Sequence, residues 1–186
     1  MSRGKASGRP VAHPEELVPS RIWFQRKFQL GLPIDSFPDI LERLRGTPAR
    51  LEERVRGIPR EVLVRREGDA WSIQENVGHL GDLESLWAAR LEQFGQGIDR
   101  LQAADLENRA THEAGHNKAA LDDLLSRFRR GRTSLVGRLE LLRSGALSRT
   151  ALHPRLGQPM TVVDHCFFIA EHDDHHLATI GKLLRS

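Results

Sequence analysis

Apolar residues recur along this chain at a spacing close to the 3.6-residue period of an α-helix. Four segments carry the pattern: about 35–58, about 72–95, about 116–143, and a last one that opens at Pro159 or Thr161. No two segments show the alternation that predicts a pair of half-buried strands. Because amphipathic helices bury their apolar stripes against one another, the pattern predicts an all-α fold, a four-helix bundle.

Local signals refine the first two helices. Gly46 and Pro48 fall inside the first segment, and proline removes a backbone hydrogen bond from a helix interior. We therefore expect a bend or a brief break there. Ser72 followed by Glu75 has the spacing of a capping box, in which each side chain accepts a hydrogen bond from a free backbone N–H. The second helix should begin sharply at this point.

Arginines gather in the third helical segment, mostly off its apolar stripe. Long cationic side chains on that side of a helix are usually solvated. We interpret the following residues as a solvent-facing group: Arg127, Arg129, Arg130, Arg132 and Arg138.

The N-terminal part differs in composition from the rest. Residues 1–20 are small, polar and rich in proline and glycine, which predicts a mobile arm. Residues 21–32 contain a tryptophan and two phenylalanines and should pack on the domain or on a second subunit. We divide the chain into a mobile N-terminal arm, residues 1–34, and a helical domain, residues 35–186.

Composition describes an ordinary water-exposed domain. The 186 residues are 39% hydrophobic and 28% charged, enough for one domain with its own core. No apolar run reaches the length of a membrane span and no signal-peptide pattern opens the chain, so we expect a cytoplasmic protein without a membrane partner. The single cysteine, Cys166, lies in an apolar run and is interpreted as a buried small hydrophobe.

Charge gives little indication of a macromolecular partner. The net charge is +3 and the pI is about 9.6, with acidic and basic residues mixed along most of the sequence. Aromatic residues make up only 5% and none is tyrosine. Nucleic-acid binding usually needs a concentrated basic face with stacking aromatics, so we expect no nucleic-acid partner.

Candidate chemistry concentrates in the last helix. His172 and His176 are four residues apart, so both side chains lie on one helix face and can converge on one metal ion. That face also carries Ile169 and Ile180, which predicts that it points inward. His175 lies on a more polar face and is the alternative to His176, because positions three apart on a helix are also neighbours.

Two imidazoles do not make a tight metal site, so a third ligand is needed. His79 is the candidate, because it lies mid-helix beside the apolar stripe of the second helix, which is long enough to run along the last one. The remaining histidines are expected in loops or at helix ends, where polarity alone explains them: His13, His112, His116, His153 and His165. Of these, His153 is the best placed to overhang a site.

Three motifs in this order resemble the DinB/YfiT-like family of metal-binding four-helix bundles, over about residues 35–184. They are Trp71-Ser72-x-x-Glu75-x-x-x-His79-Leu80, His153-Pro154-x-Leu156-Gly157-x-Pro159-Met160-Thr161 and His172-x-x-x-His176-Leu177-x-x-Ile180. The resemblance implies three metal ligands, His79, His172 and His176. It also implies a homodimer, a divalent metal, usually zinc or nickel, and small-molecule chemistry with bacillithiol, mycothiol or glutathione in some relatives.

Three functions are consistent with an open three-histidine site. The leading hypothesis is transfer of a low-molecular-weight thiol to an electrophile, with the metal holding the thiolate. The second is hydrolysis by metal-bound hydroxide, for which Glu75 or Asp82 would be the general base. Helix capping for Glu75 and a supporting or solvated role for Asp82 are the alternatives. The third is a non-enzymatic, metal-binding dimer.

Overall fold

The computed structural model describes residues 21–186, so the predicted mobility of residues 1–20 lies outside the described residues. Four long helices dominate: α1 (Phe37–Val55), α3 (Ile73–Gln96), α5 (Leu121–Glu140) and α7 (Val162–Leu183). The connecting elements are η1 (Trp23–Gln25), η2 (Ile34–Ser36), α2 (Arg60–Leu63), α4 (Arg109–Glu113), η3 (His116–Lys118), α6 (Ser144–Leu147), β1 (Thr150–Leu152) and β2 (Pro159–Thr161).

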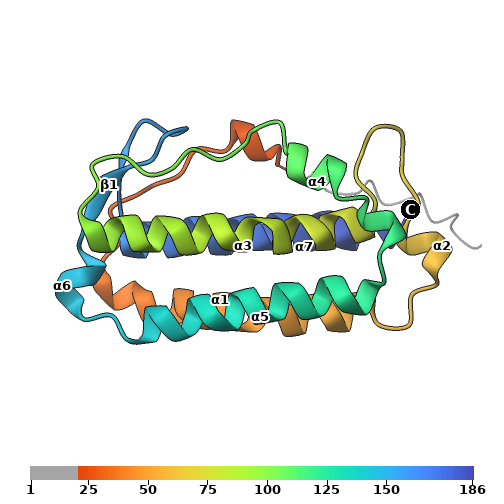
Figure 1. Ribbon diagram of the computed structural model, residues 1–186, viewed down its shortest axis with the longest axis horizontal. Coiled ribbons are helices and arrows are strands. Elements are labelled where there is room, and N and C mark those ends of the chain that lie inside the picture. The colour runs from red at the N-terminus through yellow and green to blue at the C-terminus, as the bar shows by residue number, and fades with distance from the viewer. Residues whose placement is uncertain (1–20) are drawn as a thin grey trace, which may run out of the picture.

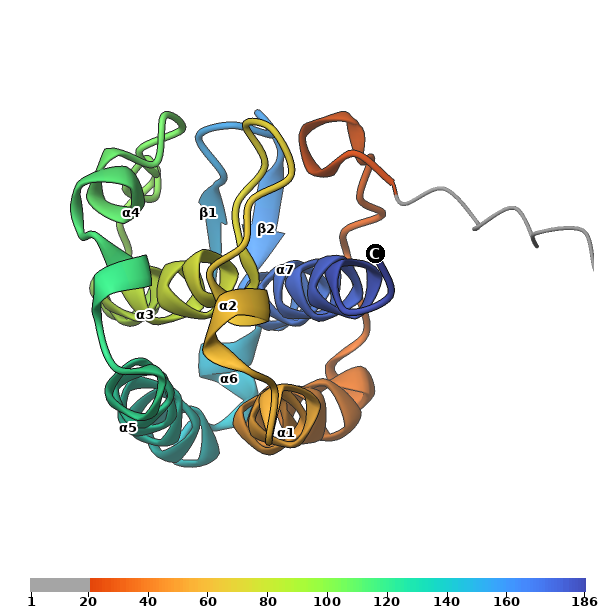
Figure 2. The ribbon, with the colours of Figure 1, turned by 90° about the vertical axis from the view of Figure 1, so that its right-hand side faces the viewer.

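The long helices form two layers, with α3 beside α7 in one and α5 beside α1 in the other (Figure 1; Figure 2). A third, irregular layer covers the outer face of the α3–α7 pair. It holds the two strands, α4 and the N-terminal segment (Figure 2). The predicted all-α four-helix bundle is confirmed. The α3–α7 pair lies between the bundle core and this cover.

Buried apolar side chains fill the space between the layers in two groups. One surrounds the end of the bundle near α6, and the other surrounds the end near α2. Fully buried members include Leu44, Leu51, Phe128, Met160 and Ile180. Cys166 is also fully buried, and burial raises the pKa of its thiol to about 12. The predicted role of Cys166 as a small core residue is therefore confirmed.

Of the bend or brief break that the sequence predicted at Gly46 and Pro48, the break does not occur, because α1 runs without interruption from Phe37 to Val55. A proline at position 48 leaves the carbonyl oxygen of Leu44 without its usual helical donor. In this fold Arg132 Nη1 donates to that oxygen at 3.4 Å. A donor from α5 thus replaces the missing hydrogen bond, and Pro48 itself is buried in the core.

The absence of a strand pair was also predicted wrongly. β1 and β2 pair antiparallel, with Ala151 opposite Met160. Each strand has three residues, too few to produce a recognisable alternation in the sequence. The pair closes the turn-rich loop that the sequence placed before the last helix, and it holds residues 153–158 over the α3–α7 layer (Figure 2).

Both helices of the α3–α7 pair begin with a capping box. Ser72 and Glu75 cap α3 as predicted, and Thr161 and Asp164 cap α7 in the same way. Asp164 Oδ1 also accepts the backbone N–H groups of Gly31 and Leu32, each at 2.9 Å. The start of α7 is therefore tied to the N-terminal segment.

Residues 21–34 pack on their own domain, which resolves the two alternatives that the sequence left open. Phe28 is buried, and the ring centroids of Trp23 and Phe168 are 5.3 Å apart. The guanidinium of Arg26 forms an ion pair with Glu171 of α7. This segment supplies a wall of the cavity described below, while a domain boundary at residue 34 stays a prediction.

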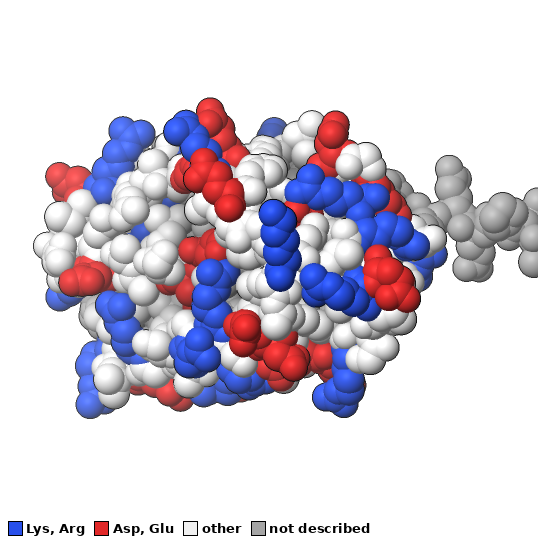
Figure 3. Space-filling view, turned by 45° about the vertical axis from the view of Figure 1, so that its right-hand side comes forward, with Lys and Arg blue, Asp and Glu red and all other residues white. Residues whose placement is uncertain are grey.

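Charges of both signs are interspersed on the face shown in Figure 3. Several form surface ion pairs, such as Arg129 with Glu52 at 2.6 Å and Arg45 with Glu140 at 2.7 Å. No helix among residues 21–186 has the length and hydrophobicity needed to cross a membrane.

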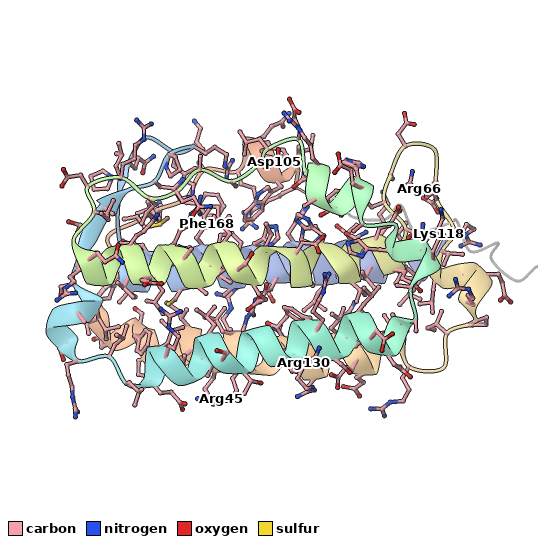
Figure 4. All side chains as sticks on the ribbon, in the orientation of Figure 1. Arg45, Arg66, Asp105, Lys118, Arg130 and Phe168 are labelled. Atoms are coloured by element: carbon pink, nitrogen blue, oxygen red, sulfur yellow. The ribbon has the colours of Figure 1, made fainter. Side chains whose placement is uncertain are left out.

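Arg132 departs from the predicted solvent-facing arginine group. It is 1% exposed and lies between the two layers. Its guanidinium pairs with Glu84 of α3 at 2.7 Å and with Asp173 of α7. Thr47 of α1 donates to the same Asp173 at 2.8 Å. One buried cluster thus connects all four long helices, whereas Arg130 lies on the outer side of α5 (Figure 4).

Replacing Arg132 by methionine should lower the free energy of unfolding by about 3–5 kcal/mol, because Glu84 and Asp173 would remain buried without a cation. Urea denaturation at neutral pH measures the change. The matched control is Arg130→Met on the exposed face of the same helix, expected within about 0.5 kcal/mol of the wild type. Equal stability of the two variants would contradict the structural role of the cluster.

Candidate metal centre

Three histidines from two neighbouring helices meet on the outer side of the bundle. His79 comes from α3, and His172 and His176 come from successive turns of α7. One ring nitrogen of each lies within 4.8 Å of the other two. The side chains are 4%, 4% and 7% exposed. The structure therefore brings together the three residues that the sequence proposed as ligands.

His175 lies outside this cluster. It is partly buried, and its ring is 5.6 Å from that of Trp23 and 5.4 Å from that of His176. The helix turns it toward the N-terminal segment and away from His79. Among residues 21–186, the converging set contains His176 and not His175.

A hydrogen bond fixes the tautomer of His176. Its Nδ1 lies 2.8 Å from Oδ1 of Asn76, and the Nδ2 of Asn76 donates to the carbonyl oxygen of Ser72 at 2.8 Å. Because the amide oxygen can only accept, His176 donates through Nδ1–H and presents the lone pair of Nε2 to the cluster. Asn76 was not among the residues predicted for the site, although it lies one turn before His79 on the same helix.

A longer chain of hydrogen bonds orients His79. Its Nδ1 lies 3.0 Å from Oγ1 of Thr111, and that hydroxyl donates to Asp82 at 2.8 Å. Because the Thr111 hydroxyl donates its proton to Asp82, it can only accept from His79. His79 therefore donates through Nδ1–H and keeps the lone pair of Nε2 free. Arg127 and His116 hold the same carboxylate, at 2.7 and 2.8 Å.

The sequence analysis explained His116 by polarity alone, and this prediction is wrong. His116 is 2% exposed and binds the Asp82 carboxylate. Its ring lies directly on the backbone of α3 at Gly78, where a Cβ atom would come within 2.3 Å of the ring. A glycine at this position therefore allows the imidazole to reach Asp82. The Asp82 carboxylate supports His79 through Thr111 and does not line the cavity.

Burial keeps the three imidazoles neutral. It is the main cause that lowers the pKa of His79 to about 4, and it lowers the pKa values of His172 and His176 well below 6.5. The Nε2 atoms of His172 and His176 are 3.2 Å apart. Two lone pairs at this distance repel one another unless a proton or a cation lies between them. This donor set fits a divalent cation that prefers nitrogen ligands.

The cluster lies at the floor of a cavity of about 470 Å³. The walls are largely aromatic and include all three tryptophans of the chain, Trp23, Trp71 and Trp87. Phe168 projects into the space between the α3–α7 layer and the cover, and Asp105 lies in the covering segment above it (Figure 4). Three histidines facing such a cavity leave room for a further, non-protein ligand, as in catalytic zinc sites.

The two other sequence candidates have different positions. Glu75 caps α3 and pairs with Arg66, so both of its oxygens are engaged. It does not line the cavity, which matches the capping alternative. His153 follows β1, is 2% exposed and does line the cavity. His153 therefore lies over the site, as expected, but its ring is buried in the cavity wall and is not exposed to solvent.

Residues 43–180 match the sequence profile of the DinB superfamily. The chain belongs to this superfamily. The match includes His79, His172 and His176, and it confirms the resemblance found in the sequence. No curated protein matches the chain.

Two solved structures share the DinB fold with this chain. YfiT from Bacillus subtilis, described as a probable metal-dependent hydrolase with an unusual four-helix bundle topology, superposes with a TM-score of 0.76 at 18% identity. That match covers 86% of this chain and 92% of YfiT. A mycothiol-dependent maleylpyruvate isomerase superposes with a TM-score of 0.64 at 12% identity, over 81% of this chain and 61% of the isomerase.

Replacing Asn76 by alanine should weaken zinc binding by about 10–100-fold, because His176 would lose the acceptor that fixes its ring. Competition with a chromogenic chelator measures the affinity of the folded variant. Ser85→Ala, an exposed change on the same helix, is the control and should bind zinc as the wild type does. His176→Ala should abolish tight binding. Wild-type affinity in Asn76→Ala would show that the amide does not orient the ligand.

His165 gives a prediction about pH. It lies near the start of α7, as expected, but it is 1% exposed, so polarity at a helix end does not explain it. Burial lowers its pKa to about 3, against about 6.5 in the unfolded chain. The unfolded state therefore binds more protons between these values, and the contribution of His165 to stability is lost as the pH falls through this window. His165→Phe removes that term, so its stability relative to the wild type should rise by about 2–3 kcal/mol from pH 7 to pH 4.5.

Urea denaturation of the two proteins at a series of pH values measures this difference. The exposed Ser85→Ala variant, which removes no ionisable group, is the control and should keep the pH dependence of the wild type. A constant difference between His165→Phe and the wild type would contradict the prediction.

Proposed function

We propose that this protein is a metal-dependent enzyme that transfers a low-molecular-weight thiol to a small electrophile. The observation that carries the proposal is the neutral three-histidine cluster at the floor of an aromatic cavity. His79, His172 and His176 would hold a divalent metal, zinc or nickel. When bound, such a metal acts as a Lewis acid that lowers the pKa of a thiol or of water.

Neither carboxylate that the sequence offered as the general base of a hydrolase is free to activate a water molecule at the cluster. Asp82 is occupied by Thr111, His116 and Arg127, and Glu75 by Arg66 and its own helix cap. Neither lines the cavity. A thiol is acidic enough to ionise at a metal without such a base.

His175 is the group best placed to accept the thiol proton. It lines the cavity beside the cluster, and burial, with the nearby Arg26, lowers its pKa. It is therefore neutral at pH 7 and able to accept a proton. The aromatic walls would exclude water and hold an apolar electrophile against the sulfur.

Metal-dependent hydrolysis is the second candidate, and the likeness to YfiT favours it. The mycothiol-dependent isomerase, a thiol-using relative in fold, supports the first. A homodimer, a cytoplasmic location and the absence of a nucleic-acid partner stay predictions.

Purified protein should contain one divalent metal per chain and should conjugate a thiol such as mycothiol, bacillithiol or glutathione to a chlorinated aromatic or an epoxide. Elemental analysis and a conjugation assay measure both properties in the wild type and in His176→Ala. The variant should lose metal and activity together. His112→Ala, which changes an exposed histidine near the site, should keep both.

Two results would contradict the thiol proposal. A metal-loaded protein that hydrolyses esters or amides but conjugates none of the thiols would be a hydrolase. A wild type without bound metal would remove both enzymatic proposals.

A further inference from the structure

Two arginines in the wall of the cavity have no carboxylate partner among residues 21–186. Arg90 comes from α3 and Arg155 from the loop between β1 and β2, and both line the same cavity as the histidine cluster. Arg90 is 1% exposed. Arg132 is equally buried, but its guanidinium forms ion pairs with two carboxylates. Arg90 therefore differs from the other fully buried arginine that the structure describes.

Neutral groups hold the guanidinium of Arg90 in place. Its Nε donates to the carbonyl oxygen of Gln102 at 2.9 Å, and its Nη1 lies 3.3 Å from Nε2 of His153. The positive centre is 5.5 Å from the ring of Trp87. These contacts orient the guanidinium without neutralising it, and Nη2 has no partner within residues 21–186.

Arg155 is held by aromatic rings. Its guanidinium carbon lies 5.5 Å from the ring of Phe24, 5.7 Å from that of Phe168 and 5.8 Å from that of Trp23. Its Nη2 is buried and has no hydrogen-bond partner in the described part of the chain. A buried donor without an acceptor is costly, so this nitrogen is a position where a ligand atom would be stabilised.

The two positive charges also act on each other and on His153. Burial, followed by the charge of Arg155, lowers the pKa of Arg90 to about 10, and burial lowers the pKa of Arg155. Burial and both arginines lower the pKa of His153 to about 3, so this histidine is neutral. This part of the wall is therefore positive and uncompensated in apolar surroundings, an arrangement that an anion would stabilise.

Two acidic residues also line the cavity, Glu67 and Asp105. The Asp105 carboxylate accepts the backbone N–H groups of Glu107 and Arg109 at 3.1 and 2.8 Å. It therefore stabilises its own loop. Glu67 lies in the loop between α2 and α3, which is at the opposite end of the cover from the strand loop that carries Arg155 (Figure 1). Neither forms an ion pair with Arg90 or Arg155.

We propose that Arg90 and Arg155 form a subsite that binds the carboxylate of a small acid with a flat, apolar body. The guanidinium fork matches a carboxylate, and the aromatic walls match the body of such an acid. The proposal rests on the proposed function and deepens it, because it names the substrate class: an acid whose reactive end lies toward the histidine cluster while its carboxylate lies on the arginines.

Tryptophan fluorescence of the full chain measures binding, because all three tryptophans line the cavity. Benzoate is titrated against benzamide, its neutral analogue, and phenyl phosphate. The titration is done on the metal-containing protein and on chelator-treated protein, since a carboxylate can also bind a metal. Benzoate should bind both forms, at least about 10-fold tighter than benzamide, since a hydrogen bond to a charged group contributes about 1.5–3 kcal/mol.

Arg155→Met should weaken benzoate binding by about 10–100-fold and leave benzamide binding unchanged. Arg155→Lys, which keeps the charge and loses the fork, should have an intermediate effect, and it serves as the test if the methionine variant does not fold. Arg100→Met removes an exposed arginine that does not line the cavity. It should bind benzoate as the wild type does.

Three results would overturn the subsite. They are equal binding of benzoate and benzamide, benzoate binding that disappears with the metal, and undiminished benzoate binding in folded Arg155 variants. Tighter binding of phenyl phosphate than of benzoate would overturn the assignment to a carboxylate. Each is read from binding alone, so the subsite can fail while thiol transfer stands. Thiol transfer can likewise fail in the conjugation assay while the subsite stands.

Discussion

The structure depends on keeping three neutral imidazoles side by side at the interface of α3 and α7. Burial lowers their pKa values, and one ring nitrogen of each lies within 4.8 Å of the other two. Neutral imidazoles this close need a proton or a cation between their nitrogens, so other parts of the chain must hold the two helices in position. Helix caps, the Arg132 cluster and the cover layer all serve this end.

The polar groups on each side of the histidine cluster have a different role. On the bundle side, Arg132 joins Glu84 and Asp173, and it lies immediately behind the helix turn that carries His172. On the flank, Asn76 fixes which ring nitrogen His176 presents, and the Thr111–Asp82 pair does the same for His79. On the cavity side, Arg90 and Arg155 bring positive charge without a carboxylate partner among residues 21–186. The hydrogen-bonded groups orient the site, and these two arginines face the space where a ligand would lie.

The cover layer is what turns a helix pair into an enclosed cavity. The N-terminal segment supplies Trp23, the strand loop supplies His153 and Arg155, and the segment before α4 supplies Asp105. These pieces are far apart in sequence. Each is tied down locally, for example by the Asp164 carboxylate that accepts the backbone of Gly31 and Leu32.

The sequence by itself determined the four long helices, the cap of α3 and the pairing of His172 with His176 on one face, because helical periodicity and i, i+4 spacing are local properties. It offered His79 as the third ligand, but only the packing of α3 on α7 brings that residue to the pair. It could not show that Arg132 is buried, since carboxylates from two other helices, α3 and α7, neutralise that charge. It also could not show that α1 continues through Pro48, because the compensating donor comes from α5. The roles of Asn76, Thr111 and the unpaired arginines were decided by the tertiary structure, since hydrogen-bond partners and missing counter-charges exist only between segments that folding brings together.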